Sequence, residues 1–238
     1  MSLRQTCLLD IDVLPQPDDI TCGPTCLQAV YGYWGHHVGL DEAISSIEPL
    51  PDGGTIAASL ACDALRKGFA ATIYTYNLLT FDPTWFPDTS NLGEQLEKQK
   101  QAKNDPKLNL ATDTYREFLR LGGTVQYQQL NAELLRGLLD DGKPILTGLS
   151  ATYLYECARE LNDEYDDVRG EPSGHFVVLC GYDRSKDLIM VADPHEHDHY
   201  QSRFYPVKTD RVIASILLGI VTYDANLLII TPKVANSE

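Results

Sequence analysis

Apolar residues recur every three or four positions through much of the first part of the chain, the spacing that places side chains on one face of a helix. The clearest case covers residues 24–34, and Gly35 directly after it is expected to end the helix. Its shared apolar face consists of Cys26, Leu27, Val30, Tyr31 and Trp34. Similar patterns predict further helices over residues 41–47, 55–67, 115–121 and 131–141.

Shorter apolar runs, separated by charged or turn residues, dominate the chain after Lys143-Pro144. They predict strands over residues 145–149, 175–183, 188–193, 203–207 and 227–232, and an earlier alternating segment predicts one over 70–76. Helices that come first and strands that come later, without regular alternation, indicate an α+β fold. We therefore predict that an N-terminal helical part packs on a C-terminal antiparallel sheet.

The chain is predicted to form a single domain over residues 1–238, because 43% hydrophobic residues in a chain of this length suffice for a packed core. Residues 81–113 are more polar and are expected to form an insertion, with an exposed helix over 91–103. The apolar stretch 212–223 falls short of the ~20 residues that span a bilayer. We expect it to be a buried strand or helix, and we expect no association with membranes.

The charge balance and the first residues of the chain bear on the partners and the location of the protein. Lysine and arginine number 19 against 34 acidic residues, which gives a formal net charge of -15 and argues against a nucleic-acid partner. The first residues lack the basic and apolar pattern of a secretory signal, so a cytoplasmic location is expected. These features leave the oligomeric state open.

One of the six cysteines stands in a distinctive setting. Cys22 is followed by Gly23-Pro24, where the first helix begins, and Gln16 precedes it by six positions. A thiol at a helix N-terminus lies near unpaired N–H groups and the positive end of the helix dipole, which favour the thiolate. The Gln16 amide and the Cys22 N–H are suited to stabilise an oxyanion in acyl transfer, and Gly23 permits close approach of a substrate.

A thiolate nucleophile needs a base, and His175 is the strongest candidate. It begins a predicted strand, so rigid structure holds its ring. The following strand ends at Asp193-Pro194, and a hairpin between the two strands would bring Asp193 beside His175, where it can fix the tautomer of the ring. The residues thus predict a Cys22, His175 and Asp193 triad.

These motifs resemble those of the papain-like peptidases that remove double-glycine leader peptides from bacteriocins, together with their stand-alone relatives. In that family a glutamine precedes a Cys-Gly pair by six positions, a Gly-His-Phe/Tyr-Val-Val-Leu strand supplies the base, and an Asp-Pro pair supplies the acid. Here these are Gln16, Cys22-Gly23, residues 174–179 and Asp193-Pro194. The sequence departs from the family at Thr21, where aspartate is common, and in the 81–113 insertion.

The resemblance implies a papain-like fold and a cysteine peptidase that cleaves a peptide or isopeptide bond in a peptide or protein substrate, without a cofactor. No transporter region accompanies the motifs, so a soluble stand-alone relative is expected. Gly23, Gly174 and His195 are expected to contact the substrate.

Several alternatives stay open from the sequence. An acyl or peptidyl transferase would use the same residues with an amine in place of water, and a non-catalytic relative would bind peptides in the same cleft. Alternate histidines at His195, His197 and His199 suit a metal ion, although a polar loop explains them as well. A disulfide between Cys22 and Cys26 is disfavoured, because residues four apart on a helix hold their Cβ atoms ~5 to 6 Å apart.

Overall fold

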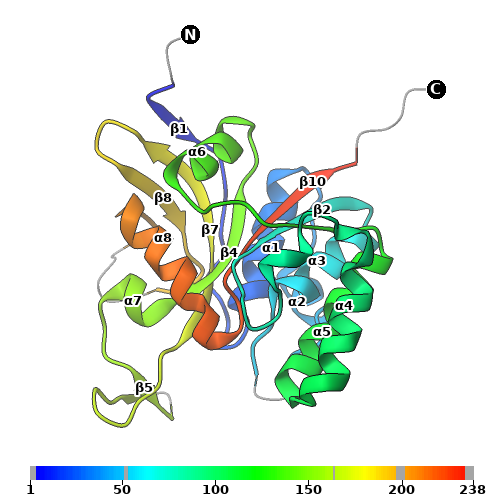
Figure 1. Ribbon diagram of the computed structural model, residues 1–238. Helices are drawn as coiled ribbons and strands as arrows, with labels where there is room; N and C mark the ends of the chain where they lie inside the picture. The colour runs from blue at the N-terminus through cyan, green and yellow to red at the C-terminus, as the bar shows by residue number, and fades with distance from the viewer. Residues whose placement is uncertain (1–3, 51–52, 163, 197–201, 234–238) are drawn as a thin grey trace, which may run out of the picture.

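A computed structural model describes residues 4–50, 53–162, 164–196 and 202–233. A large, mostly antiparallel sheet runs through the protein, with helices on both faces (Figure 1). Its main path has the order β3 (Thr124–Gln126), β2 (Phe69–Thr75), β10 (Asn226–Pro232), β4 (Ile145–Ser150), β7 (Gly174–Asp183), β8 (Leu188–Ala192) and β9 (Phe204–Lys208). A further strand, β1 (Thr6–Leu8), pairs with the end of β7. A separate two-stranded ribbon is formed by β5 (Glu160–Leu161) and β6 (Glu164–Tyr165).

Two hydrophobic cores lie on opposite faces of the sheet, because successive side chains of a strand point in opposite directions. In β7, Phe176 and Val178 enter the core beneath α1 (Cys22–Tyr33), α2 (Leu40–Ser45) and α3 (Ala57–Arg66). Val177 and Leu179 enter the core beneath α6 (Ala132–Asp140), α7 (Ala151–Tyr155) and α8 (Thr209–Leu218).

The predicted α+β class is confirmed, with one refinement in the sheet. Strand β2 comes from the N-terminal, mostly helical part of the chain, yet it pairs with β10 inside the sheet and runs parallel to β3. The two parts of the chain therefore share one sheet. The stretch 212–223, for which strand and helix were both open, forms most of α8 and a following 3-10 turn at Gly219–Thr222.

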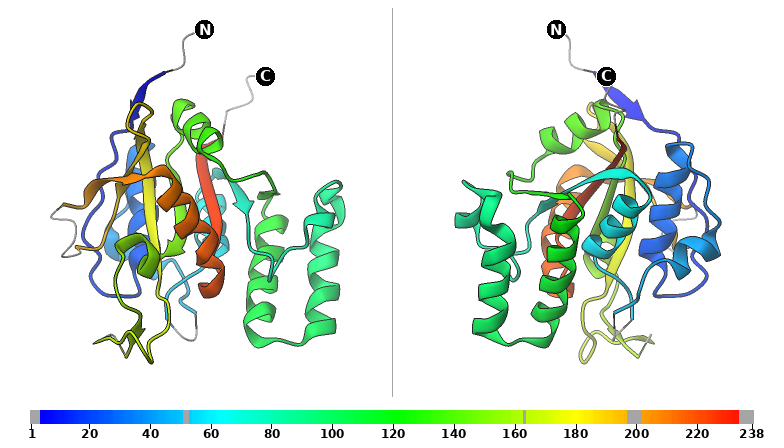
Figure 2. Two further views of the ribbon diagram at one scale, coloured as in Figure 1. Left: turned by 60° about the vertical axis from the view of Figure 1, so that its left-hand side comes forward. Right: turned by 90° about the vertical axis from the view of Figure 1, so that its right-hand side faces the viewer.

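Two antiparallel helices, α4 (Leu92–Lys103) and α5 (Pro106–Arg120), stand beside the sheet as a hairpin (Figure 2). The sequence predicts the bounds of α4 closely. It predicts that the next helix begins at residue 115, which is nine residues after the observed start of α5. Pro106 occupies the first turn, and the Asp105 side chain caps the helix by accepting a hydrogen bond from the Leu108 N–H at 2.8 Å. Helix α5 packs on α3, which brings this segment against the main body of the protein.

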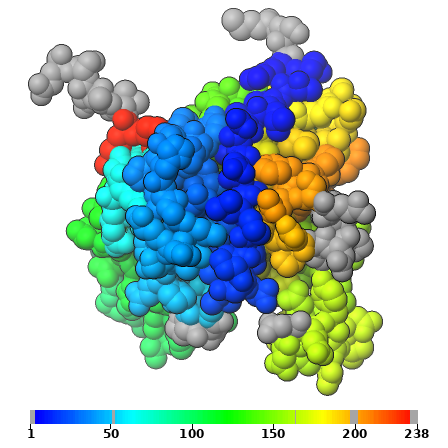
Figure 3. All heavy atoms as spheres, turned by 180° about the vertical axis from the view of Figure 1, so that it is seen from behind, coloured from blue at the N-terminus to red at the C-terminus, as the bar shows by residue number. Residues whose placement is uncertain are grey.

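The N-terminal segment before α1 runs as an extended strap across the back of the molecule (Figure 3). The backbone N–H of Leu9 donates to Cys180 O at 2.7 Å, and the Arg203 side chain donates to Val13 O at 3.1 Å. This path carries the chain to the start of α1. Within the described residues, no helix is both long and apolar enough to cross a membrane.

Candidate active site

Cys22 is the first residue of α1, which begins two residues before the predicted start of this helix at Pro24. The first turn of this helix contains no acidic side chain, and Pro24 has no N–H to leave unpaired. Thr25 secures the start of the helix, since both its N–H and its hydroxyl donate to Thr21 O, at 3.1 and 2.8 Å. The Cys22 side chain therefore projects from a well-fixed helix N-terminus, where the helix dipole favours negative charge.

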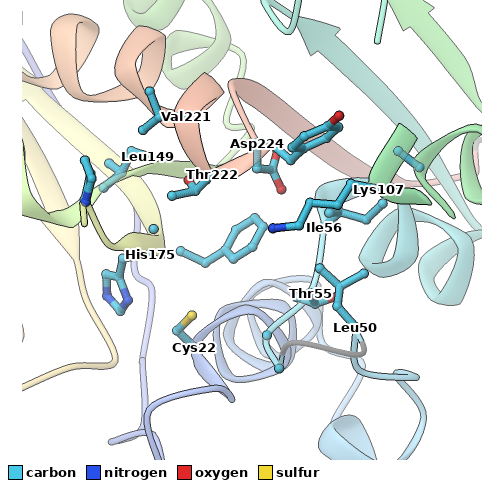
Figure 4. A pocket seen from close by; sticks show the side chains of 18 of the residues that line it. Cys22, Leu50, Thr55, Ile56, Lys107, Leu149, His175, Val221, Thr222 and Asp224 are labelled. Atoms are coloured by element: carbon cyan, nitrogen blue, oxygen red, sulfur yellow. The ribbon is translucent and has the colours of Figure 1, made fainter. Parts of the chain in front are cut away.

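His175 lies between Cys22 and Asp193. It is near the start of β7, opposite Leu149 of β4, and its ring is buried. His175 Nε2 lies 2.7 Å from Asp193 Oδ1, and the Cys22 side chain is close enough to the ring to contribute to its raised pKa. Because Nε2 is engaged by the carboxylate, Nδ1 is the nitrogen left for the sulfur. Figure 4 shows the two side chains of Cys22 and His175 together at one end of a cavity.

Asp193 is fully buried, and four donors surround its carboxylate. Besides the His175 ring, Oδ1 accepts the backbone N–H of His195 at 2.9 Å. Oδ2 accepts hydrogen bonds from the hydroxyl groups of Tyr155, at 2.8 Å, and Tyr205. Both carboxylate oxygens are thus satisfied, as a buried charge requires.

The two tyrosines belong to the candidate site, and no pattern in the sequence predicts them there. Tyr155 ends α7, a helix that was not predicted, and Tyr205 lies in β9. The available signal was weak: Tyr205 shares the alternating face of its strand with Val207, and a buried tyrosine hydroxyl requires a hydrogen-bond partner. Nothing local in the sequence identifies Asp193 as that partner.

The charges of the site depend on one another. Burial alone would lower the pKa of His175, but the Asp193 carboxylate, and to a lesser extent Cys22, outweigh it and raise the pKa to about 10. Burial alone would raise the pKa of Asp193, but the His175 ring and the hydrogen bonds from Tyr205 and the His195 N–H lower it. The pair is therefore an imidazolium and a carboxylate at neutral pH.

Gln16 lies on the strap that precedes Cys22. Its backbone N–H donates to Pro194 O at 2.9 Å, so the segment before Cys22 is bonded to the segment after Asp193. Its side-chain Nε2 donates to Asp18 O at 2.8 Å, which leaves one N–H of the amide for another acceptor. Its role at an oxyanion stays a prediction.

Gly23, Gly174 and His195 are the residues expected to contact substrate. All three lie close to the triad, but their immediate neighbours differ. A Cβ atom at Gly23 would lie 2.4 Å from Thr55 Cγ2, so tight packing alone explains a glycine there. Gly174 lines the cavity, and a Cβ atom there would lie 2.6 Å from Thr222 Oγ1. The His195 ring packs edge-on against His175, with centroids 5.9 Å apart. Substrate contact by these residues stays a prediction.

Cys26 is a poor nucleophile in this setting. Its thiol is completely buried and donates to Phe176 O at 3.2 Å, and burial followed by the nearby Cys22 raises its pKa well above the usual range. All six cysteines are free thiols, including Cys22 and Cys26. Within the described residues, no group of three His, Cys, Asp or Glu side chains is arranged to hold a metal ion, while His197 and His199 of the alternate-histidine hypothesis lie outside these residues.

A cavity of about 670 Å³ opens beside Cys22 and His175 (Figure 4). Both halves of the fold line it: residues 53–56 and the start of α5 on one side, and residues of β4, β7 and the segment 221–224 on the other. The sequence analysis did not connect α5 with the site. Its first turns lie within residues 81–113, so the segment predicted to be an insertion forms part of the cavity wall.

The helix N-terminal cysteine and the His-Asp pair at the ends of two neighbouring strands of a mostly antiparallel sheet define a papain-like fold. The chain belongs to the Peptidase C39-like family, whose profile matches residues 8–211, and this confirms the resemblance found in the sequence. A candidate C39-like peptidase from Bacillus anthracis has a similar crystal structure, with a TM-score of 0.55 and 15% identity over 98% of this chain and 100% of that chain. At this identity the likeness shows the fold alone. No curated protein matches the chain.

Proposed function

We propose that the protein is a cysteine peptidase in which Cys22 is the nucleophile, His175 exchanges protons with it and with the substrate, and Asp193 orients His175. The observation that carries the proposal is the position of the His175 ring, which lies beside Cys22 (Figure 4) and hydrogen-bonds to a buried carboxylate. This is the arrangement that activates a thiol for acyl transfer.

In the proposed reaction, the Cys22 thiolate attacks the carbonyl carbon of a peptide or isopeptide bond. The Cys22 N–H and the Gln16 amide donate hydrogen bonds to the resulting oxyanion. As the C–N bond breaks, the protonated His175 gives its proton to the leaving amine, which leaves a thioester on Cys22. Water then attacks the thioester while His175 accepts a proton, so the acid product leaves and the thiolate returns. No step requires a cofactor.

The proposed substrate is a peptide or protein that enters the cavity beside Cys22. A nucleic-acid substrate does not suit a chain with a net charge of -15. A cytoplasmic location stays a prediction from the sequence.

Replacing Cys22 tests the proposal directly. The Cys22→Ala variant is expected to lose both hydrolysis of a mixed peptide library, followed by mass spectrometry, and labelling by iodoacetamide at neutral pH. The matched control is Cys157→Ala, because Cys157 is a partly exposed thiol away from the cavity. Its activity should equal that of the wild type. Hydrolysis by the Cys22→Ala variant at the wild-type rate would refute the assignment of the nucleophile.

A further inference from the structure

Asp224 is a second buried carboxyl group in the cavity that contains Cys22 and His175, and the proposed reaction does not use it. It follows the 3-10 turn Gly219–Thr222 and is only 4% exposed, yet it lines the cavity (Figure 4). Oδ2 accepts the N–H of Ala57, the first residue of α3, at 2.7 Å, and Oδ1 accepts the side-chain amide of Asn226.

The carboxyl group is held rigidly in this position. Gly148 of β4 packs so closely that a Cβ atom there would lie 2.8 Å from Asp224 Cγ. The two hydrogen bonds fix the direction of each oxygen, and each oxygen keeps a second lone pair. The position of an acceptor in the cavity is thus set before any ligand arrives, which lowers the entropy cost of binding.

Among the described residues, no positively charged side chain forms a hydrogen bond or ion pair with Asp224, although Lys107 lines the same cavity. Its two hydrogen-bond donors are neutral, and it forms no ion pair with any described lysine, arginine or histidine. Burial raises its pKa to about 7, although the hydrogen bonds from Asn226 and the Ala57 N–H oppose this effect. A cation that reached the carboxylate would relieve the cost of its burial.

The walls between the two ends of the cavity are largely apolar, and they consist of Leu50, Ile56, Leu110, Leu149, Phe176 and Val221. An alkyl chain with a charged end suits such walls, because its methylene groups bury apolar area while its end group reaches the acid. The ionisable groups nearer the solvent are Asp19, Glu171 and Lys107, so carboxylates outnumber ammonium groups in the cavity.

We propose that Asp224 determines specificity by binding the ammonium or guanidinium group of a basic substrate side chain that enters this cavity. The inference deepens the proposed peptidase function and rests on it for the identity of the substrate. A basic side chain would hydrogen-bond to Asp224 while the scissile carbonyl carbon lies at Cys22. A neutral side chain of the same length would fill the cavity but leave the carboxylate unpaired.

Alkylating probes test this inference without requiring peptide hydrolysis. N-alkyl bromoacetamides react with Cys22 by displacement of bromide, and their arms can be made in a series of lengths that end in either an ammonium or a methyl group. The measured quantity is the ratio of the alkylation rate constants of the two probes of equal length. In the wild type at pH 8.5, we expect the ratio to peak at one arm length and to be about tenfold higher than in Asp224→Asn, since charged hydrogen bonds are the stronger ones.

Asp19→Asn is the matched control, because it removes an exposed carboxylate from the lining of the same cavity. Its ratio should stay within about twofold of the wild type, since water screens exposed charges. A ratio that is the same in Asp224→Asn and in the wild type, or one that does not depend on arm length, would overturn the inference. If the ratio behaves as expected but no peptide is hydrolysed, only the proposed peptidase function fails.

The pH dependence of the ratio in the wild type provides a test even if Asp224→Asn fails to fold. Both probes react with the same thiol, so the titration of Cys22 and His175 cancels in the ratio. Helix α5 carries two titratable groups that bear on this cavity. Lys107 lines it, and Tyr115 interacts with Asp224, where burial followed by Asp224 raises the pKa of Tyr115 well above the usual range, so Tyr115 stays neutral. The cationic preference should be present above pH 7 and should disappear as the pH falls through about 7. A ratio that stays constant from pH 5.5 to 8.5 would contradict the role of Asp224.

Discussion

The substitution Asp193→Asn isolates the contribution of one charge to the site. Asparagine can keep its carbonyl oxygen at the Oδ1 position, where it accepts from the His175 ring and the His195 N–H. Its amide nitrogen would then face Tyr155 and Tyr205, whose hydroxyl groups can rotate to accept instead of donate. The hydrogen-bond geometry is retained, and the negative charge beside His175 is removed.

The expected effect on His175 is large. Burial, which lowers the pKa of this ring, remains in the variant, whereas the carboxylate that raises it to about 10 is lost. The pKa should therefore fall below the ordinary 6.5. A change from about 10 to 6.5 corresponds to about 5 kcal/mol of lost preference for the imidazolium. At pH 7 the ring should be neutral, and alkylation of Cys22 by iodoacetamide should slow by at least about tenfold.

Two measurements check this prediction. The ¹⁵N chemical shifts of the His175 ring report its pKa in both proteins, with Asp10→Asn as a control for loss of an exposed carboxylate. The free energy of unfolding provides the second measurement. Because the His175 pKa is raised in the folded wild type, its stabilisation is fully present below pH 6.5 and is lost as the pH rises through about 10. Asp193→Asn should lack this loss. A His175 pKa that stays above about 8 in the variant would refute the assigned role of the carboxylate.

Two further predictions concern packing around the site. Tyr205→Phe removes one of the two hydroxyl donors to Asp193 Oδ2 and should lower the free energy of unfolding, measured by urea titration, by about 2 kcal/mol. The control is Tyr153→Phe, at an exposed tyrosine of α7, which should change the free energy of unfolding little. Equal stabilities of the two variants would contradict a stabilising role for the buried hydroxyl. Gly23→Ala places a Cβ atom against the Thr55 methyl group and should cost about 1 to 3 kcal/mol. Adding Thr55→Ser, which removes that methyl group, should restore part of the loss, and the absence of any restoration would contradict the packing explanation.

The parts of the fold and site that the sequence predicts are those with local signals. The helical spacing around Cys26 and the alternation of β7 depend only on neighbouring residues, and both agree with the structure. The sequence also predicts that Asp193 lies beside His175, because the two residues lie at the ends of adjacent strands joined by a short turn. Local order along the chain thus determines much of this geometry.

The parts that the sequence does not predict depend on contacts between distant segments. Tyr155 and Tyr205 meet at Asp193 only because α7 and β9 pack on the same end of the sheet. The start of α5 reaches the cavity because that helix packs on α3, which its polar composition did not suggest. The sequence did contain a sign that Asp224 has a special role. It interrupts a strongly apolar stretch, and an acidic residue in a segment predicted to be buried requires a specific partner or a function.

The spacing of Gln16 and Cys22 along the chain follows from the contact between the N-terminal strap and the end of the sheet. Gln16 and Cys22 lie on the strap and on α1, while Asp193 and Pro194 follow β8, yet the Gln16 N–H bonds to Pro194 O at 2.9 Å. This bond joins the segment that leads to Cys22 with the segment that carries Asp193, on the face where the strap crosses the molecule (Figure 3). A change in the number of residues between Gln16 and Cys22 would therefore displace either the bond or the start of α1. The six-residue spacing of the motif is accordingly a geometric requirement, because it fixes the helix N-terminus relative to the His-Asp pair.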